Sequence, residues 1–132
     1  MSFFKIFYIF FLTTFFFSSC EKETKDYRDK YAGTWLFKVK TNEYLMGSNG
    51  YNRNDSVEYI GKIQKGSAKN EIIIVYTKTN EITLTINDLG ELSNFPTIYC
   101  VGNLENDDKI SISLRWGGLG GSTSHVIDGF KF

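Results

Sequence analysis

Hydrophobic and polar residues alternate with a period of two along most of the chain after Gly33. This period is typical of β-strands that bury one face. Trp35, Phe37 and Val39 show it first, separated by residues that include Lys38. The pattern of hydrophobic and polar residues predicts eight strands, within residues 35–40, 57–64, 71–77, 81–86, 91–95, 97–104, 109–116 and 122–132.

The segments between these strands are short and rich in glycine, asparagine and aspartate, which tolerate the backbone angles of tight turns. Short turns join antiparallel neighbours, so we expect an all-β, antiparallel up-and-down meander of about eight strands. Such a meander removes its exposed edges by closing as a small barrel, whose interior is filled by side chains or holds one small ligand. A two-sheet β-sandwich is the alternative. Only residues 42–55 are expected to form a long loop.

The start of the chain follows a different pattern, because eight of the twelve phenylalanines lie within residues 1–17. A single cation, Lys5, precedes an uncharged stretch that ends at Ser19. This is the layout of a secretory signal peptide, here residues 1–19. The stretch is too short to span a bilayer, which takes about 20 apolar residues.

The residues Phe17-Ser18-Ser19-Cys20 resemble the lipobox of bacterial lipoproteins. In that family small residues precede a cysteine that is acylated and becomes the first residue after cleavage; Phe17 departs from the aliphatic residue usual at its position. The resemblance implies lipidation of Cys20 with palmitate-type chains, and several such chains hold a protein firmly on a membrane. The implied location is a bacterial outer membrane, on its periplasmic face or at the cell surface.

Residues 20–30 are dense in charge and have little to bury, so we expect a solvated tether between the lipid and a single barrel domain of residues 31–132. At the start of that domain, Lys30, Gly33 and Trp35 are spaced as in the KxxGxW motif of lipocalins and related calycins. The resemblance implies a barrel with Trp35 at its closed end, opposite a cation near the end of the last strand. Lys131 stands there in place of the family's arginine, and Arg115 is expected at the other rim.

Candidate catalytic chemistry is sparse in this sequence. The sole histidine, His125, is close to Ser124 and Asp128, but adjacent strand residues point to opposite faces, so Ser124 and His125 cannot share one site. We therefore expect no enzyme activity and a surface or cross-strand role for His125. Cys100 lies in an apolar run and is predicted to be a buried, unreactive thiol; the rival is a disulfide with Cys20, which requires that Cys20 is not lipidated.

Metal and nucleic-acid sites are not indicated either. One histidine and one lipidated cysteine supply no ligand set for a metal ion, and no cofactor is expected. The formal net charge of zero offers no basic surface for nucleic acid.

Two non-catalytic functions remain, and the first is a lipid-anchored binding module of the cell envelope that contacts a protein or glycan. The long loop and the glycine-rich hairpin at residues 117–121 would present the contact surface, with Tyr44, Leu45, Met46 and Tyr51 of the loop as contact residues. The alternative is a lipocalin-like carrier of a small hydrophobic ligand. Its ligand would be lined by aromatic residues at the barrel mouth or interior, with Trp35, Phe37, Tyr59, Tyr76 and Trp116 as the candidates. We favour the binding module.

Overall fold

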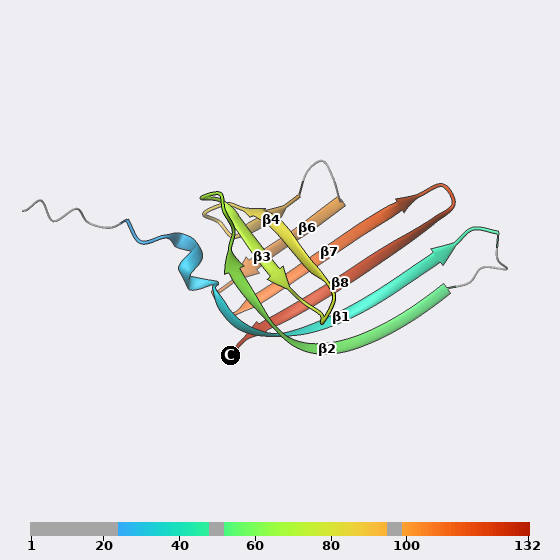
Figure 1. Ribbon diagram of the computed structural model, residues 1–132, viewed down its shortest axis with the longest axis horizontal. Helices are drawn as coiled ribbons and strands as arrows, with labels where there is room; N and C mark the ends of the chain where they lie inside the picture. Colours follow the sequence, from blue (N-terminus) through green and yellow to red (C-terminus); the bar gives the residue numbers. More distant parts are fainter. Residues whose placement is uncertain (1–23, 48–51, 95–98) are drawn as a thin grey trace, which may run out of the picture.

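The computed structural model describes residues 24–47, 52–94 and 99–132, which form an antiparallel β-barrel preceded by a short 3₁₀ helix (Figure 1). Consecutive strands pair in order and the last strand pairs with the first, so the meander closes and the sandwich alternative is excluded. The elements are η2 (Tyr27–Lys30), β1 (Gly33–Leu45), β2 (Asn52–Lys65), β3 (Glu71–Val75), β4 (Glu81–Ile86), β5 (Glu91–Ser93), β6 (Tyr99–Glu105), β7 (Lys109–Gly118) and β8 (Gly121–Lys131).

The period-two pattern of the sequence is the inside–outside pattern of the barrel. In β4, Ile82, Leu84 and Ile86 are buried, whereas the residues between them are exposed. The tight turns follow from local chemistry too: in the three-residue connection between β6 and β7, Asn106 and Asp107 both have positive φ, which asparagine and aspartate tolerate. The polar cluster near residue 106 is therefore a turn.

The barrel is complete only at one end. Strand β2 pairs with β3 over Lys62–Lys65 alone, whereas it pairs with β1 along nearly its whole length. Beyond that short ladder β1, β2, β7 and β8 continue together as a curved open sheet, which extends to the right in Figure 1. We call the complete part, with the β2–β3 turn at residues 66–70, the closed end, and the region around Met46 and Leu119 at the hairpin tips the open end.

The expectation of a long loop over residues 42–55 is wrong. Strand β1 continues to Leu45, and β2 has begun at Asn52, with Thr41 opposite Asp55 and Glu43 opposite Arg53. The polar composition of this stretch disfavours strand, but cross-strand pairs and the ladder between β1 and β8 stabilise it. The connection shrinks to residues 46–51, of which 48–51 lie outside the described residues.

Trp35 and Phe37 fill the closed end, where both side chains are fully buried and their rings stack with centroids 6.3 Å apart. The Trp35 indole Nε1 donates a hydrogen bond to the Tyr31 carbonyl oxygen, at 2.9 Å. Lys131 lies at this end, as expected, and its ammonium group donates to the Lys30 carbonyl oxygen, at 2.7 Å. Arg115 pairs with Ser124 toward the open end, so its expected position at the other rim is confirmed.

The expectation of a solvated tether over residues 20–30 is wrong for the stretch from Asp26 to Lys30. That stretch folds onto the closed end as η2, capped by the Asp26 side chain, and buries Arg28. The cause is tertiary, because the Arg28 guanidinium reaches carbonyl groups of the β2–β3 turn that no local pattern places beside it. Cys20, with residues 1–23, lies outside the described residues.

Candidate binding site at the open end

Three aromatic side chains meet where the closed part of the barrel gives way to the open sheet. His125 of β8 lies between Tyr76, which follows β3, and Trp116 of β7. The His125 ring meets the Trp116 ring edge-on with centroids 4.7 Å apart, and its Nδ1 is hydrogen-bonded to the Tyr76 hydroxyl, at 3.0 Å. We call these three residues the aromatic triplet. The edge-on contact with His125 holds the Trp116 indole in place.

The aromatic triplet is uncharged near neutral pH. Burial lowers the pKa of His125, although the carboxylate of Glu43 opposes this shift, and burial raises the pKa of Tyr76 to about 12. The imidazole and the phenol therefore share a hydrogen bond between neutral groups, which suits a structural support.

The same sheet face carries the thiol of Cys100, which is half-buried. Cys100 lies opposite Leu114, and Leu114 lies opposite His125, so a strand separates the thiol from the imidazole. Burial raises the pKa of Cys100 to about 11, which keeps the thiol protonated and unreactive. The thiol was predicted to be buried, whereas the structure shows it half-buried.

A shallow hollow of about 470 Å³ adjoins Trp116 on the open sheet. Across strands β1, β8 and β7, the register places Glu43, Thr123 and Trp116 side by side. The middle strand contributes only small residues from Gly121 to Thr123. The hollow therefore runs along β8, with Glu43 and Leu45 on one side and the fixed indole on the other.

Large apolar side chains project into solvent just beyond this hollow. Leu119, at the tip of the β7–β8 hairpin, is 99% exposed, and Met46, which follows β1, is 68% exposed. The backbone N–H of Met46 donates to the Gly120 carbonyl oxygen, at 3.1 Å, which ties the two tips together. With Tyr44 and Leu45, which are about half exposed, they form a group that we call the apolar tip.

The structure separates the aromatic residues proposed as ligand contacts into two groups. Trp35 and Phe37 belong to the packed core of the closed end, and the half-buried Tyr59 lies opposite Phe37 on β2. Tyr76 and Trp116 instead join the aromatic triplet at the open end. The candidates chosen from the sequence therefore include residues from both ends of the barrel, and the sequence did not show which residues belong to which end.

Of the proposed loop contacts, Tyr44 and Leu45 lie on β1 and Met46 follows it, while Tyr51 lies outside the described residues. Leu119 lies in the hairpin of residues 117–121 that was expected to share the contact surface, although it was not named as a contact residue. His125 was expected at the surface or across a strand. It is buried to 7% exposure because the barrel curves its face inward beneath Trp116.

The predicted strand position of Ser124 and His125 is confirmed by the register. Ser124 and His125 point to opposite faces of β8, and Asp128 accepts a hydrogen bond from the Ser111 hydroxyl, at 3.0 Å, on the outer face. Among the described residues, no group of three or more His, Cys, Asp or Glu side chains is arranged to hold a metal ion.

A second exposed apolar group lies on the outer face of the barrel. Leu36 of β1 lies opposite Ile60 of β2 on one side and Phe130 of β8 on the other, and Ile60 is 62% exposed. This row lies in the ladders that β1 forms with β2 and β8, and the other edge of β2 at Ile60 is unpaired among the described residues. Ile60 therefore provides a control position for substitutions at the apolar tip.

No protein-family model, curated protein or solved structure matches this chain. Within the described part of the chain, no helix combines the length and the apolar character needed to cross a membrane.

Proposed function

We propose that this chain is a lipid-anchored binding module of the bacterial cell envelope, held at the outer membrane through Cys20, and that the apolar tip contacts a protein partner. The observation that carries the proposal is that four large, exposed apolar side chains lie at the two hairpin tips, which the Met46–Gly120 hydrogen bond joins. Contiguous exposed apolar side chains mark interaction sites, and Met, Tyr and Trp are enriched in protein interfaces.

The apolar tip has no evident role in folding. Its backbone is held by the β1–β8 ladder and by the Met46–Gly120 hydrogen bond, while its side chains contribute nothing to the buried core. The Tyr44, Leu45 and Met46 side chains therefore stand on a scaffold that pre-orders them, and a partner loses little entropy in binding them.

A protein fits this surface better than a glycan or an enclosed small molecule does. The four side chains project outward, so they require recesses in the partner, and the hollow beside Trp116 offers a complementary recess. An extended peptide cannot pair with β8, the middle strand of the hollow, because β8 is already paired on both edges.

Carriage of a small hydrophobic ligand is the second candidate, in keeping with the lipocalin resemblance of the first strand. Trp35, Phe37 and Ile127 fill the closed interior, so such a ligand would occupy the hollow at the open end. The half-buried Trp116 favours this alternative, because an apolar compound in the hollow would contact its indole. Quenching of tryptophan fluorescence by apolar compounds, lost in a Trp116→Phe variant, would establish it.

The test of the favoured function uses the full chain, expressed with a C-terminal tag and captured from envelope membranes after chemical cross-linking. A Met46→Ser, Leu119→Ser double variant should lose the cross-linked protein and keep the melting temperature, whereas Ile60→Ser on the outer face should retain both. Loss with Ile60→Ser but not with the double variant would contradict a contact at the apolar tip. A co-purifying small molecule without any cross-linked protein would instead support the carrier.

The anchor is tested separately by incorporation of labelled palmitate. The wild-type chain should incorporate the label and sediment with membranes. A Cys20→Ala variant should do neither, and its retention in the membrane fraction would refute lipid anchoring at this cysteine.

A further inference from the structure

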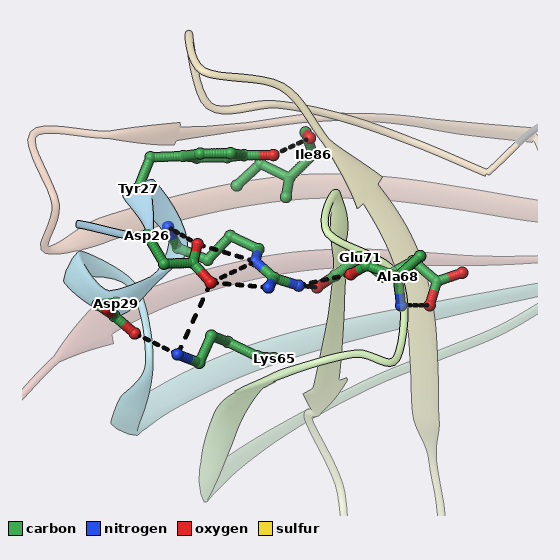
Figure 2. A network of polar contacts seen from close by, with 8 residues as sticks. Asp26, Tyr27, Asp29, Lys65, Ala68, Glu71 and Ile86 are labelled. Atoms are coloured by element: carbon green, nitrogen blue, oxygen red, sulfur yellow. Dashed lines mark hydrogen bonds and ion pairs between the residues drawn. The ribbon is translucent and has the colours of Figure 1, made fainter. Parts of the chain in front are cut away.

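The segment from Asp26 to Tyr31 is clamped onto the closed end by one buried arginine, and we call it the N-terminal clip (Figure 2). The Arg28 Nη1 atom donates to two backbone carbonyl oxygens across the β2–β3 connection, those of Ala68 at 2.6 Å and Glu71 at 2.9 Å. Arg28 is only 8% exposed, so these bonds are largely shielded from water.

Three further contacts hold the clip. The Asp26 carboxylate accepts hydrogen bonds from the Arg28 Nε and Nη2 atoms, which holds the pKa of Asp26 well below its usual range. The Tyr27 hydroxyl donates to the Ile86 carbonyl oxygen at the end of β4, at 2.9 Å. On the outside, the Lys65 ammonium pairs with Asp29, at 2.5 Å. The clip is thus bonded to β2, the β2–β3 turn and β4, and cannot swing freely about the start of β1.

These contacts fix where the chain leaves the barrel. Asp26 lies at the closed end, and β1 carries the chain from there to the open end over thirteen residues (Figure 1). At a rise of about 3.3 Å per residue, that strand measures roughly 40 Å along its path. Five residues lie between Cys20 and Asp26, and the six Cα–Cα steps from one to the other span at most about 20 Å when fully extended.

From this geometry we infer that the N-terminal clip orients the barrel on the membrane, with the closed end toward the lipid and the apolar tip directed away from it. The inference rests on the proposed lipid anchor at Cys20. The tether is shorter than the body of the protein, so while the clip is closed the barrel cannot stand inverted, with its open end on the bilayer and its closed end pointing away. Without the clip, the tether would run on to Gly33 and that restriction would be lost.

The orientation also decides between two occupants of the apolar tip. Exposed Leu, Met and Tyr side chains at hairpin tips suit either a bilayer surface or a protein. Because the tip is directed away from the membrane that carries the lipid, its occupant is a protein in the aqueous compartment on that side of the membrane.

The test measures energy transfer from a fluorescent label to acceptor dyes on lipid headgroups. The full chain is expressed, purified with its lipid in detergent and reconstituted into phosphatidylcholine vesicles. A Cys100→Ser background removes the free thiol, and single labels are placed through Lys69→Cys at the closed end or Leu119→Cys at the apolar tip. Both positions are exposed and contribute nothing to the core, so neither change should disturb the fold.

We expect at least threefold stronger transfer from position 69 than from position 119. Equal transfer, or stronger transfer from position 119, in protein that floats with the vesicles would overturn the orientation and leave the anchor intact. Protein that does not float with the vesicles would overturn the anchor and, with it, the orientation.

A clip variant adds a second readout. Arg28→Ala should narrow the difference between the two labels in protein that remains folded by circular dichroism, whereas Arg115→Ala, an exposed arginine of β7, should preserve it. An unchanged difference in folded Arg28→Ala protein would show that the clip does not set the orientation.

Discussion

The Phe37 ring is packed between two glycines of neighbouring strands, Gly61 and Gly129. A side chain added at either glycine should therefore destabilise the fold by overpacking. A methyl group added at Gly129 would lie 2.8 Å from the Phe37 ring and 2.4 Å from Ile110 Cγ2. Both neighbours are fully buried and have no room to withdraw. We therefore expect Gly129→Ala to lower the free energy of unfolding by about 1–3 kcal/mol through overpacking, measured by urea denaturation.

Gly118 provides the matched control for that substitution. It lies near the end of β7, and a methyl group added there would meet nothing within 4 Å. Gly118→Ala should leave the free energy of unfolding nearly unchanged. Equal destabilisation by the two variants would mean that Phe37 is not tightly enclosed.

The buried imidazole of His125 makes stability depend on pH. Burial lowers its pKa in the folded state, with Glu43 as the opposing charge, whereas the unfolded chain has the ordinary histidine pKa of about 6.5. As the pH falls below about 6.5, the unfolded chain binds the proton first, so the free energy of unfolding falls. Between pH 7.5 and 5, we expect a steeper loss in the wild type than in His125→Gln.

Urea denaturation of both chains at several pH values measures this difference. The carboxylates titrate in both proteins, and His125 is the only histidine in the chain, so the difference in slope isolates its proton. Parallel pH profiles would show that the folded and unfolded states bind that proton equally.

Among the elements, the N-terminal clip is short, yet we expect it to contribute substantially to the stability of the fold. Arg28→Ala removes charged hydrogen bonds to Asp26, Ala68 and Glu71. We expect a loss of about 1–3 kcal/mol in the free energy of unfolding, because charged hydrogen bonds of a guanidinium that is only 8% exposed would be lost. Lys65→Ala removes an exposed ion pair of the same network and should have little effect. A loss for Lys65→Ala as large as that for Arg28→Ala would contradict the assigned role of the buried guanidinium.

The clip and the extended hairpin show why part of this architecture could not be predicted from the sequence. Strand β4 was predicted correctly because its hydrophobic and polar residues alternate locally, and this alternation matches the buried and exposed faces of the strand. The polar ends of β1 and β2 are stabilised by their partners, and Arg28 finds its acceptors about forty residues away. Neither cause leaves a local pattern, so the sequence predicted a loop and a solvated tether there.

The candidate site was predictable to a similar degree. Tyr44, Leu45 and Met46 were identified as apolar residues in a polar stretch, and Trp116 as an aromatic near a hairpin. Their grouping depends on the register between β1, β8 and β7, which also brings His125 beneath Trp116. Register between strands distant in sequence is set by the closed barrel, and a single sequence does not display it.

The molecule as a whole combines a packed, closed half with an open half of lower expected local stability. Residues 53–60 of β2 pair with β1 on one edge, and among the described residues no strand pairs with the other edge. Strand β8, in contrast, is paired on both edges along its length. Backbone N–H groups on an unpaired edge are exposed to solvent and exchange their hydrogens without unfolding of the barrel.

Hydrogen–deuterium exchange should therefore divide the two strands. We expect alternate amides of residues 53–60 to exchange at the earliest times measured, while amides in the middle of β8 exchange only when the barrel unfolds.

Added partner protein should slow exchange at Met46 and around Leu119, because the proposed contact covers the apolar tip, and should leave the β2 edge unchanged. Protection of the β2 edge without protection of the tip would move the interaction surface to the open side of β2. Because the packed core lies in the closed half, substitutions at the tip should change the proposed contact without loss of the fold.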